Sequence, residues 1–402
     1  MDNGLGSPRN CLRILTLANH LGPRGGLERN QLAICRALAK QGHQVDVLYV
    51  SAGDFTDDWH RFTGAMIPMM GSLPRRQAPV RSVRGMLTAV RAGVASHPDV
   101  VYVYRYWDVP LAVAIGALAG APVVFHLCLP PPASVPWWLR SALGRVAATL
   151  AVSADTAQRW RGLGLRPDRV RVVPTGIDTH QFCEATNAVR LATRRELGLD
   201  AAAFMVLFAG RISREKGIDV LLRAAGEAVA DVPDMRVVIV GGPSLGADPE
   251  DSDRYAAELR NLAEGIPVTW LDLIPDVRPL LQAADVAVVP SLWPEPFARA
   301  VMEPLACGTP VVASRVGGTP EILTEWLADY LVEPGDPTVL AERLVALSSW
   351  RTDHPDLGSR CRQAAVNHLS LDREVDAVQV AFGSAIAVRH RHHGAIGDPR
   401  TP

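Results

Sequence analysis

The sequence predicts an α/β protein built from two doubly wound parallel sheets. Its 402 residues suffice for two domains at roughly 150 residues per domain, and each domain can bury its own core. Hydrophobic residues make up 48% and charged residues 21%, which is typical of a globular chain and excludes a disordered or collagen-like one. In both halves short apolar runs alternate with helical patterns, as they do in parallel sheets covered by helices.

The elements follow from the spacing of the apolar residues. A continuous or alternating apolar run predicts a strand, and apolar residues three and four apart predict a helix. In the first half these patterns predict strands at 12–18, 44–50, 100–104, 123–127 and 150–152, and a helix at 27–40. In the second half they predict strands at 204–209, 236–240, 268–271 and 286–289, and helices at 218–229, 255–264 and 277–284.

These elements divide the chain into two predicted domains, residues 1–180 and 181–388. The segment 172–196 begins with Pro174 and Gly176 and is expected to connect them, and residues 389–402, which lack apolar periodicity, are expected to form a poorly ordered tail. Ligands of open parallel sheets bind outside the carboxyl ends of the strands. Two such domains that face each other would therefore form a central cleft between them.

Charge and cysteine content bear on partners and on location. Net charge is −1, but residues 1–180 carry 20 basic against 11 acidic residues and the remainder carries 21 against 31. This asymmetry is either chance drift between domains or a basic first half that meets an anionic partner, such as a membrane surface. Six scattered cysteines, no 18-residue apolar run and no signal peptide predict a cytoplasmic protein with free thiols.

A glycine-rich turn follows the first expected strand. Gly22, Gly25 and Gly26 precede the first helix, so their backbone N–H groups could hold a phosphate at its amino end. A tight turn without a ligand is the alternative. The spacing differs from the dinucleotide pattern G-x-G-x-x-G, which disfavours a nicotinamide enzyme.

A second turn, after the first strand of the second half, carries two cations. The segment 210–217 contains Arg211 and Lys216, and Lys216 stands out because 39 of the 41 basic residues are arginine, Lys40 being the other lysine. An arginine fork beside a compact ammonium suits a diphosphate. A solvated turn is the alternative interpretation.

Two glutamates follow the 286–289 strand with seven residues between them. Prolines at 290, 294 and 296 force a loop, so the next helix can begin only near Phe297, and Gly308 ends it. Glu295 then lies in the loop and Glu303 on the helix. Carboxylates accept hydrogen bonds from neighbouring hydroxyls, so one could hold a hexose and the other a ribose. Gly317 and Gly318 would offer further N–H groups, whereas Glu303 taken alone would be an ordinary exposed acid.

Together these residues resemble the family 4 glycosyltransferases, retaining sugar-nucleotide transferases of GT-B fold, over nearly the whole chain. The resemblance rests on Gly25-Gly26-Leu27-Glu28, Val173-Pro174-Thr175-Gly176-Ile177-Asp178, Gly210-Arg211 with Lys216-Gly217, Gly241-Gly242-Pro243-Ser244, and Glu295-Pro296-Phe297 with Glu303. It implies that Arg211 and Lys216 bind the donor diphosphate, Glu303 the ribose and Glu295 the transferred sugar. It places Gly25 and Gly26 on the phosphate side, and Phe297 and Ala298 in the donor loop.

The resemblance also implies a histidine near the reacting sugar, and His126 matches it at the end of the 123–127 strand, although a histidine there is as often purely structural. This sequence has Ala298 and Pro304 where the family usually has glycine and alanine, and Thr175 where asparagine is frequent. These departures affect the expected sugar specificity more than the expected reaction.

No metal or cofactor is expected besides the donor. The sequence Asp251-Ser252-Asp253 fits a cation-binding pattern, but it precedes an expected helix, where acids serve as caps and first-turn charges. Arg211, Lys216 and helix dipoles could stabilise the leaving diphosphate without a metal.

Acceptor contacts are expected from the first half. A basic amphipathic surface is possible along Arg75, Arg76, Arg81, Arg84 and Arg91, and an ordinary surface helix is the alternative. Trp137 and Trp138, after a run of three prolines, suit a sugar or an acyl chain, or simply pack on a neighbouring helix.

The sequence therefore predicts transfer of a hexose from a UDP- or GDP-sugar to an acceptor hydroxyl with retention. The acceptor is a small molecule, a glycan or a lipid-linked sugar, the membrane contact is peripheral and anionic, and no nucleic acid is involved. The alternatives are a sugar-nucleotide epimerase of the same fold and a non-catalytic GT-B partner subunit.

Overall fold

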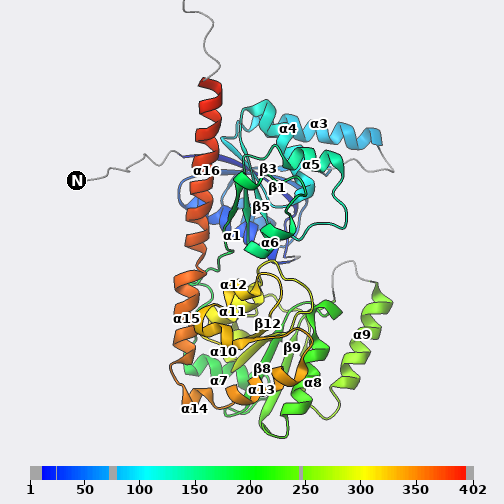
Figure 1. The fold of residues 1–402 in the computed structure, drawn as a ribbon, viewed down its shortest axis with the longest axis vertical. Helices are drawn as coiled ribbons and strands as arrows, with labels where there is room; N and C mark the ends of the chain where they lie inside the picture. The colour runs from blue at the N-terminus through cyan, green and yellow to red at the C-terminus, as the bar shows by residue number, and fades with distance from the viewer. Residues whose placement is uncertain (1–10, 24, 72–78, 244–247, 395–402) are drawn as a thin grey trace, which may run out of the picture. The chain divides into compact units, whose positions relative to one another are not determined.

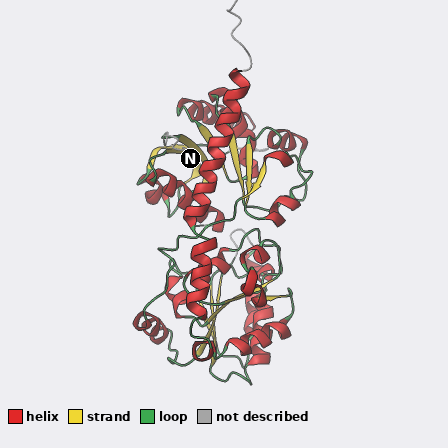
Figure 2. Ribbon diagram, turned by 60° about the vertical axis from the view of Figure 1, so that its left-hand side comes forward, coloured by secondary structure: helices red, strands yellow, loops and turns green. Residues whose placement is uncertain are grey.

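The computed structural model describes residues 11–23, 25–71, 79–243 and 248–394 (Figure 1). Its contacts divide the chain into two compact units. Unit 1 comprises Met1–Pro174 with Glu374–Pro402, and unit 2 comprises Thr175–Arg373. Each unit contains one sheet with helices on its faces, and Figure 2 separates the strands from the helices by colour.

Unit 1 contains a parallel sheet of seven strands in the order β3-β2-β1-β4-β5-β6-β7. The strands are β1 Arg13–His20, β2 Gln44–Ser51, β3 Thr63–Pro68, β4 Val100–Val103, β5 Val123–Leu127, β6 Ala148–Ala151 and β7 Val170–Val172. The central strands β4, β5 and β6 are buried along their whole length, because helices cover both faces of the sheet. Strand order reverses between β1 and β4.

The helices of unit 1 complete its core. They are α1 Gly26–Lys40, α2 Thr56–His60, α3 Pro79–Ala95, α4 Val109–Ala119, α5 Trp137–Leu143 and α6 Ala154–Arg159. One apolar cluster includes Leu17 of β1, Phe125 of β5, Ile115 of α4 and Leu139 of α5, all with essentially no exposure. This core joins the sheet to helices α4 and α5.

Unit 2 contains a parallel sheet of six strands in the order β10-β9-β8-β11-β12-β13. The strands are β8 Phe204–Ala209, β9 Met235–Val240, β10 Val268–Leu271, β11 Val286–Val289, β12 Val311–Ser314 and β13 Leu331–Val332. Its order reverses between β8 and β11. The two sheets confirm the predicted fold class of two doubly wound parallel domains.

The helices of unit 2 follow its strands in the expected alternation. They are α7 Asn187–Glu196, α8 Ile218–Ala228, α9 Pro249–Leu262, α10 Arg278–Ala283, α11 Arg299–Ala306, α12 Thr319–Ile322, α13 Pro337–Leu347, α14 Trp350–Asp353 and α15 Leu357–His368. Helix α7 lies in the segment 172–196 that was expected only to connect the domains. Apolar side chains such as Met205, Leu207, Val238 and Leu281 form the core beneath β8 and β9.

The last helix, α16 Leu371–Gly394, differs from the predicted division at residues 181–388 and 389–402. From Glu374 onward it belongs to unit 1, because its inner side packs there: the Phe382 ring lies 5.0 Å from that of Tyr102, centroid to centroid. Arg389 donates to the carbonyl oxygen of Ala121 at 2.8 Å, so the expected tail begins inside this helix. Residues 395–402 of that tail lie outside the described part.

The chain passes between the units twice, after Pro174 and after Arg373, and the unit 2 residues next to these two points are hydrogen-bonded to each other. The Ile177 N–H donates to the Leu369 carbonyl at 2.7 Å, and the Leu371 N–H donates to the Ile177 carbonyl at 2.9 Å. The Val173-to-Asp178 motif is therefore the first of two adjacent crossing segments. Among the described helices, none is long and apolar enough to span a bilayer. All six cysteines are free.

Candidate functional site

The candidate donor site is formed by loops at the carboxyl ends of β8, β11 and β12 in unit 2. These loops are residues 210–217, 290–298 and 315–318, and they flank the point where strand order reverses. In open α/β sheets this reversal opens a crevice, because neighbouring loops leave in opposite directions. Five of the predicted site residues lie on these loops: Arg211, Lys216, Glu295, Phe297 and Ala298.

At the centre of the site, Lys216 and Glu295 form an ion pair across the two loops. The Lys216 ammonium donates to Oε1 of Glu295, which also accepts the Ser291 hydroxyl at 2.8 Å. Only 9% of Glu295 is exposed, so the two charges meet in a largely desolvated place. The sequence thus led to both residues separately, and the structure brings them into direct contact.

Two glycines allow the loops to approach this closely. Gly217 has φ +66°, and a Cβ there would lie 2.0 Å from the Pro290 carbonyl oxygen. Gly317 has φ +55°, and a Cβ there would lie 2.1 Å from the carbonyl oxygen of Glu295. Only glycine tolerates both the positive φ and the contact. The Gly318 N–H donates to the same Glu295 carbonyl at 2.8 Å and so fixes the glutamate loop.

Glu303 lies on the first turns of α11, behind Glu295 in sequence. Arg299 Nε donates to it at 3.1 Å, and both side chains are mostly buried. Ala298 is the N-cap of α11 and Phe297 is buried beside it, so the helix begins two residues after the position expected at Phe297. The structure does not pair Glu303 with Glu295.

Arg211 and Glu215 form an ion pair of 2.9 Å within the 210–217 loop, and about half of the Arg211 side chain is exposed. The Glu215 backbone carbonyl accepts the Leu292 N–H at 2.8 Å, which is a second link between the β8 and β11 loops. Arg211 therefore presents a half-exposed guanidinium at the rim of the same site.

In unit 1 the predicted glycine turn opens α1. Gly25 is the N-cap, without a side-chain cap, and α1 begins at Gly26. The first N–H groups of a helix have no partner within it, so they remain available to an anion. One buried amide joins this part of the helix to β1: the Gln31 side chain donates to Thr16 Oγ1 and to the Leu17 carbonyl, both at 2.9 Å.

His126 is fully buried in unit 1 and lies in a chain of polar groups. The Tyr104 hydroxyl donates to the Tyr102 hydroxyl at 3.0 Å, which lies 2.5 Å from His126 Nδ1. Because Tyr102 thus has its own hydrogen to donate, Nδ1 accepts and Nε2 carries the ring proton. Nε2 faces Oε1 of Glu374 at 3.6 Å.

Glu374 was not predicted as a functional residue, yet it joins this chain to α1. It is buried at the start of the unit 1 portion of α16 and accepts the Asn30 amide at 3.0 Å. Burial lowers the pKa of His126 to about 3, so the ring is neutral. In this conformation His126 touches protein on all sides, and its role near the reacting sugar stays a prediction.

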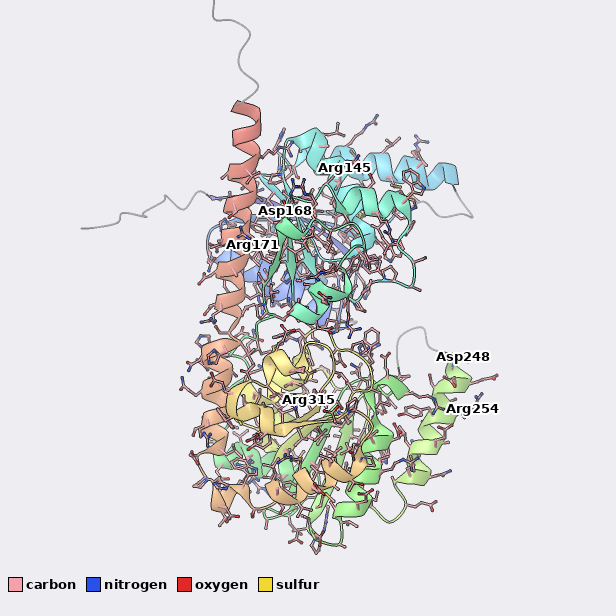
Figure 3. All side chains as sticks on the ribbon, viewed as in Figure 1. Arg145, Asp168, Arg171, Asp248, Arg254 and Arg315 are labelled. Atoms are coloured by element: carbon pink, nitrogen blue, oxygen red, sulfur yellow. The ribbon has the colours of Figure 1, made fainter. Side chains whose placement is uncertain are left out.

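The Asp251-Ser252-Asp253 sequence lies on α9, as expected for helix-start acids. The side chain of Asp248 caps the helix by accepting the Glu250 N–H at 3.0 Å, and Asp251 lies 3.8 Å from Arg254 (Figure 3). Within the described residues no three histidine, cysteine or acidic side chains gather as metal ligands. Metal independence remains a prediction.

The predicted acceptor residues are only partly described. Arg84 and Arg91 are exposed on α3, whereas Arg75 and Arg76 lie outside the described residues. Trp137 is 80% exposed at the start of α5, and Trp138 packs on Trp107 with ring centroids 6.0 Å apart.

Comparison with known proteins places this architecture in a class. The family described as "Glycosyl transferases group 1" matches residues 189–365, and "Glycosyltransferase Family 4" matches residues 24–181. A D-inositol 3-phosphate glycosyltransferase of Acidothermus cellulolyticus is 30% identical, over 96% of this chain and 93% of its own. A second one, from Catenulispora acidiphila, is also 30% identical, over 91% and 92%. The chain therefore belongs to the family 4 glycosyltransferases and is an enzyme of that class.

Solved structures agree on the fold. HepE of Anabaena, crystallised with UDP and glucose, has a TM-score of 0.78 at 21% identity, with 93% of this chain and all of that chain covered. Sucrose-phosphate synthase of Thermosynechococcus elongatus has a TM-score of 0.75 at 21% identity, with 94% and 100% covered. The two sheets are thus those of a GT-B glycosyltransferase.

Proposed function

We propose that this glycosyltransferase moves a hexose from a UDP- or GDP-sugar to a hydroxyl of an anionic acceptor, with retention and without a metal. The observation that carries the proposal is the contact between Lys216 and Glu295 across the switch point of unit 2. One group suits a diphosphate and the other suits sugar hydroxyls, and they occupy one place.

In the absence of donor, the ammonium and the carboxylate neutralise each other where a lone buried charge would be costly. When a nucleoside diphosphate sugar binds, the Lys216 ammonium turns to the diphosphate and the Glu295 carboxylate accepts hydroxyls of the sugar. Ser291 keeps its hydrogen bond to Glu295 and preserves the orientation of the carboxylate. Arg211, which is half-exposed, closes on the outer phosphate.

The chemical step needs stabilisation of the leaving diphosphate, since negative charge grows there as an oxocarbenium-like sugar forms. Within unit 2, Lys216 and Arg211 supply that stabilisation. No carboxylate is assigned as a general base. The departing phosphate itself takes the acceptor proton on the same face, which gives retention.

The acceptor is best sought among phosphorylated polyols. Unit 1 carries 23 basic against 13 acidic residues, and an electropositive domain attracts an anionic substrate. The names of the Acidothermus and Catenulispora relatives point to D-inositol 3-phosphate as the first compound to try. A lipid-linked phosphate shares this chemistry and is the second.

The donor is tested first by binding. UDP, GDP, ADP and TDP are compared by thermal shift, because a ligand that binds only the folded state raises Tm. The preferred nucleotide sugar is then incubated with D-inositol 3-phosphate, and the anomeric proton of the product is followed by NMR. An inverted anomeric centre in the first-formed product would contradict retention, and absence of binding by all four nucleotides would contradict the donor site.

Incorporation of deuterium distinguishes a transferase from an epimerase of the same fold. In deuterated water an epimerase places deuterium on a ring carbon of the donor, whereas a transferase leaves the ring unlabelled. A non-catalytic subunit would bind neither donor nor acceptor productively and would show no turnover.

A further inference from the structure

Unit 2 contains a polar cavity at the amino ends of its strands, whereas the donor loops follow their carboxyl ends. It has a volume of about 270 Å³, and its lining includes Glu184, Arg190, Thr309, Arg351 and Ser359. Thr309 and Asp285 lie just before β12 and β11, at the amino ends of these strands, whereas Glu295 follows the carboxyl end of β11. The cavity is therefore separate from the proposed donor site.

A buried aspartate beside this cavity is surrounded by three guanidinium groups. Asp285 accepts Arg190 Nη2 at 2.8 Å and Arg351 Nε at 2.6 Å, and it also accepts Arg194 Nη2. The backbone N–H of Met205 donates to the same carboxylate at 2.8 Å. One negative charge thus faces three positive ones, which leaves an excess of two positive charges.

Other charged groups do not remove this excess. Glu184 is the acidic side chain in the lining of the cavity, and it reduces the excess to one positive charge. Burial lowers the pKa of Arg351 and of Arg194, and the nearby Arg190 guanidinium lowers both further, against the opposing effect of Asp285. The guanidinium groups are therefore held close together at an electrostatic cost.

The side-chain N–H groups of these arginines differ in how many hydrogen bonds they make. Arg194 is saturated, since its nitrogens also donate to the carbonyls of Ala203 and Ala283. In contrast, Arg190 Nε is buried and meets no acceptor among the described residues. Arg190 and Arg351 both line the cavity. A buried N–H group without a hydrogen-bond partner lowers the free energy of unfolding, so Arg190 has unused hydrogen-bonding capacity beside the cavity.

We propose that this cavity binds a phosphate-type oxyanion through Arg190 and Arg351. A tetrahedral oxyanion in the cavity would accept from the guanidinium groups of Arg190 and Arg351 that line it, and it would neutralise the excess charge. The ligand is either inorganic phosphate or the phosphate group of a small monoester. The proposal stands independently of the donor and acceptor assignments.

The test measures binding of inorganic phosphate by calorimetry at constant ionic strength, with chloride as the replaced anion. The donor site could also hold phosphate, so the reference protein is Lys216→Gln, in which that site is weakened. We expect this protein to bind phosphate, and Arg190→Gln in the same background to weaken the Kd by about tenfold or more. Arg254→Gln, which removes an exposed arginine beside Asp251 on α9, is the matched control and should leave the Kd unchanged.

A second variant keeps the test decisive if Arg190→Gln does not fold. Arg351→Gln removes the more exposed of the two cavity arginines and should weaken phosphate binding similarly. Glycerol phosphate in place of inorganic phosphate distinguishes a monoester from the free ion by its lower Kd. Wild-type affinity in Arg190→Gln or Arg351→Gln, or no saturable binding of either ligand to the Lys216→Gln protein, would overturn the proposal.

Discussion

Among the predicted residues, Lys216 has the sharpest sequence signal and the clearest structural outcome. A chain with only two lysines keeps one at a strand-to-helix turn, and the structure places its ammonium on Glu295. Composition alone could indicate that the residue matters. It could not indicate the partner, which lies 79 residues further along the chain.

Replacing Lys216 with alanine should lower kcat by roughly 100-fold or more, because a preorganised cation on the leaving group is lost. Steady-state kinetics with the preferred donor measure this effect. Lys40→Ala, which removes the only other lysine, from the exposed end of α1, is the control and should keep wild-type kcat. A folded Lys216→Ala enzyme with unchanged turnover would exclude the assigned role.

His126 shows what a local pattern misses. The sequence places it correctly on β5, but its surroundings come from Tyr102 on β4 and from Glu374, 248 residues away. Sequence periodicity cannot specify which side chains of a distant helix face a strand. The chain of polar groups around His126 could therefore not be predicted from the sequence.

The buried ring of His126 predicts a pH dependence of stability. Its pKa is about 3 in the folded protein against an ordinary value of 6.5, so between these values the unfolded chain binds a proton that the folded chain does not. Stability should therefore be full above pH 6.5 and fall below it, by about 2 kcal/mol at pH 5. Urea unfolding of the wild type and of His126→Gln between pH 5 and 7.5 measures how the free energy of unfolding changes with pH. An equal pH dependence in both proteins would contradict the role of His126.

At the scale of elements, the loops of unit 2 depend on close backbone contact. Gly317→Ala places a Cβ against the Glu295 carbonyl at a positive φ, so both the β11 loop and the Lys216 contact must shift. We expect at least about 2 kcal/mol of destabilisation and loss of donor binding. Gly265→Ala, at φ +80° with nothing within 4 Å of its Cβ, isolates the cost of φ alone. Equal donor affinity in both variants would show that the contact is unimportant.

The contacts of helix α16 predict an effect on the stability of unit 1. Glu374→Ala leaves the Asn30 amide without its acceptor and His126 Nε2 without its facing carboxylate. Loss of a buried acceptor costs about 1–3 kcal/mol. Chemical unfolding should show this loss, whereas Glu342→Ala, an exposed acid on α13, should change stability by less than about 0.5 kcal/mol. A Glu374 variant as stable as the Glu342 variant would refute the anchoring role.

Most strands were predictable because their buried residues read as continuous apolar runs. Strands β5, β8, β10 and β11 have the predicted bounds. Strand β3 was missed because its sequence lacks a clear apolar run, and the short strands β7, β12 and β13 were not predicted either. The predicted end of the second domain at residue 388 differs from the division by contacts, since the sequence pattern does not state which domain residues 374–388 pack against.

At the scale of the whole molecule, the charge asymmetry is retained when the chain is divided by its contacts. Unit 1 has 23 basic and 13 acidic residues, and unit 2 has 18 and 29. The excess of acid in unit 2, the proposed donor-binding unit, disfavours a general attraction of nucleotide sugars. The proposal therefore assigns donor binding to specific cations such as Lys216.

Activity should not depend on a divalent metal. In the proposed mechanism Lys216 and Arg211 stabilise the leaving group, and the acids Asp251 and Asp253 belong to the start of α9. Rates measured in EDTA should match untreated rates within about twofold. Complete loss that manganese or magnesium restores would instead assign the leaving-group chemistry to a metal.

The basic unit 1 also predicts peripheral binding to anionic membranes. If each arginine near the surface contributes about 1 kcal/mol, screened over a Debye length of about 8 Å, binding should be strong at low salt and fade as salt rises. Flotation with phosphatidylglycerol vesicles against phosphatidylcholine vesicles measures this. The double variant Arg84→Gln/Arg91→Gln on α3 should bind less, whereas Arg254→Gln/Arg315→Gln in unit 2 should bind as wild type. Equal absence of binding to both vesicles at low salt would leave a free phosphorylated polyol as the acceptor, since the basic charge would then serve a substrate in solution.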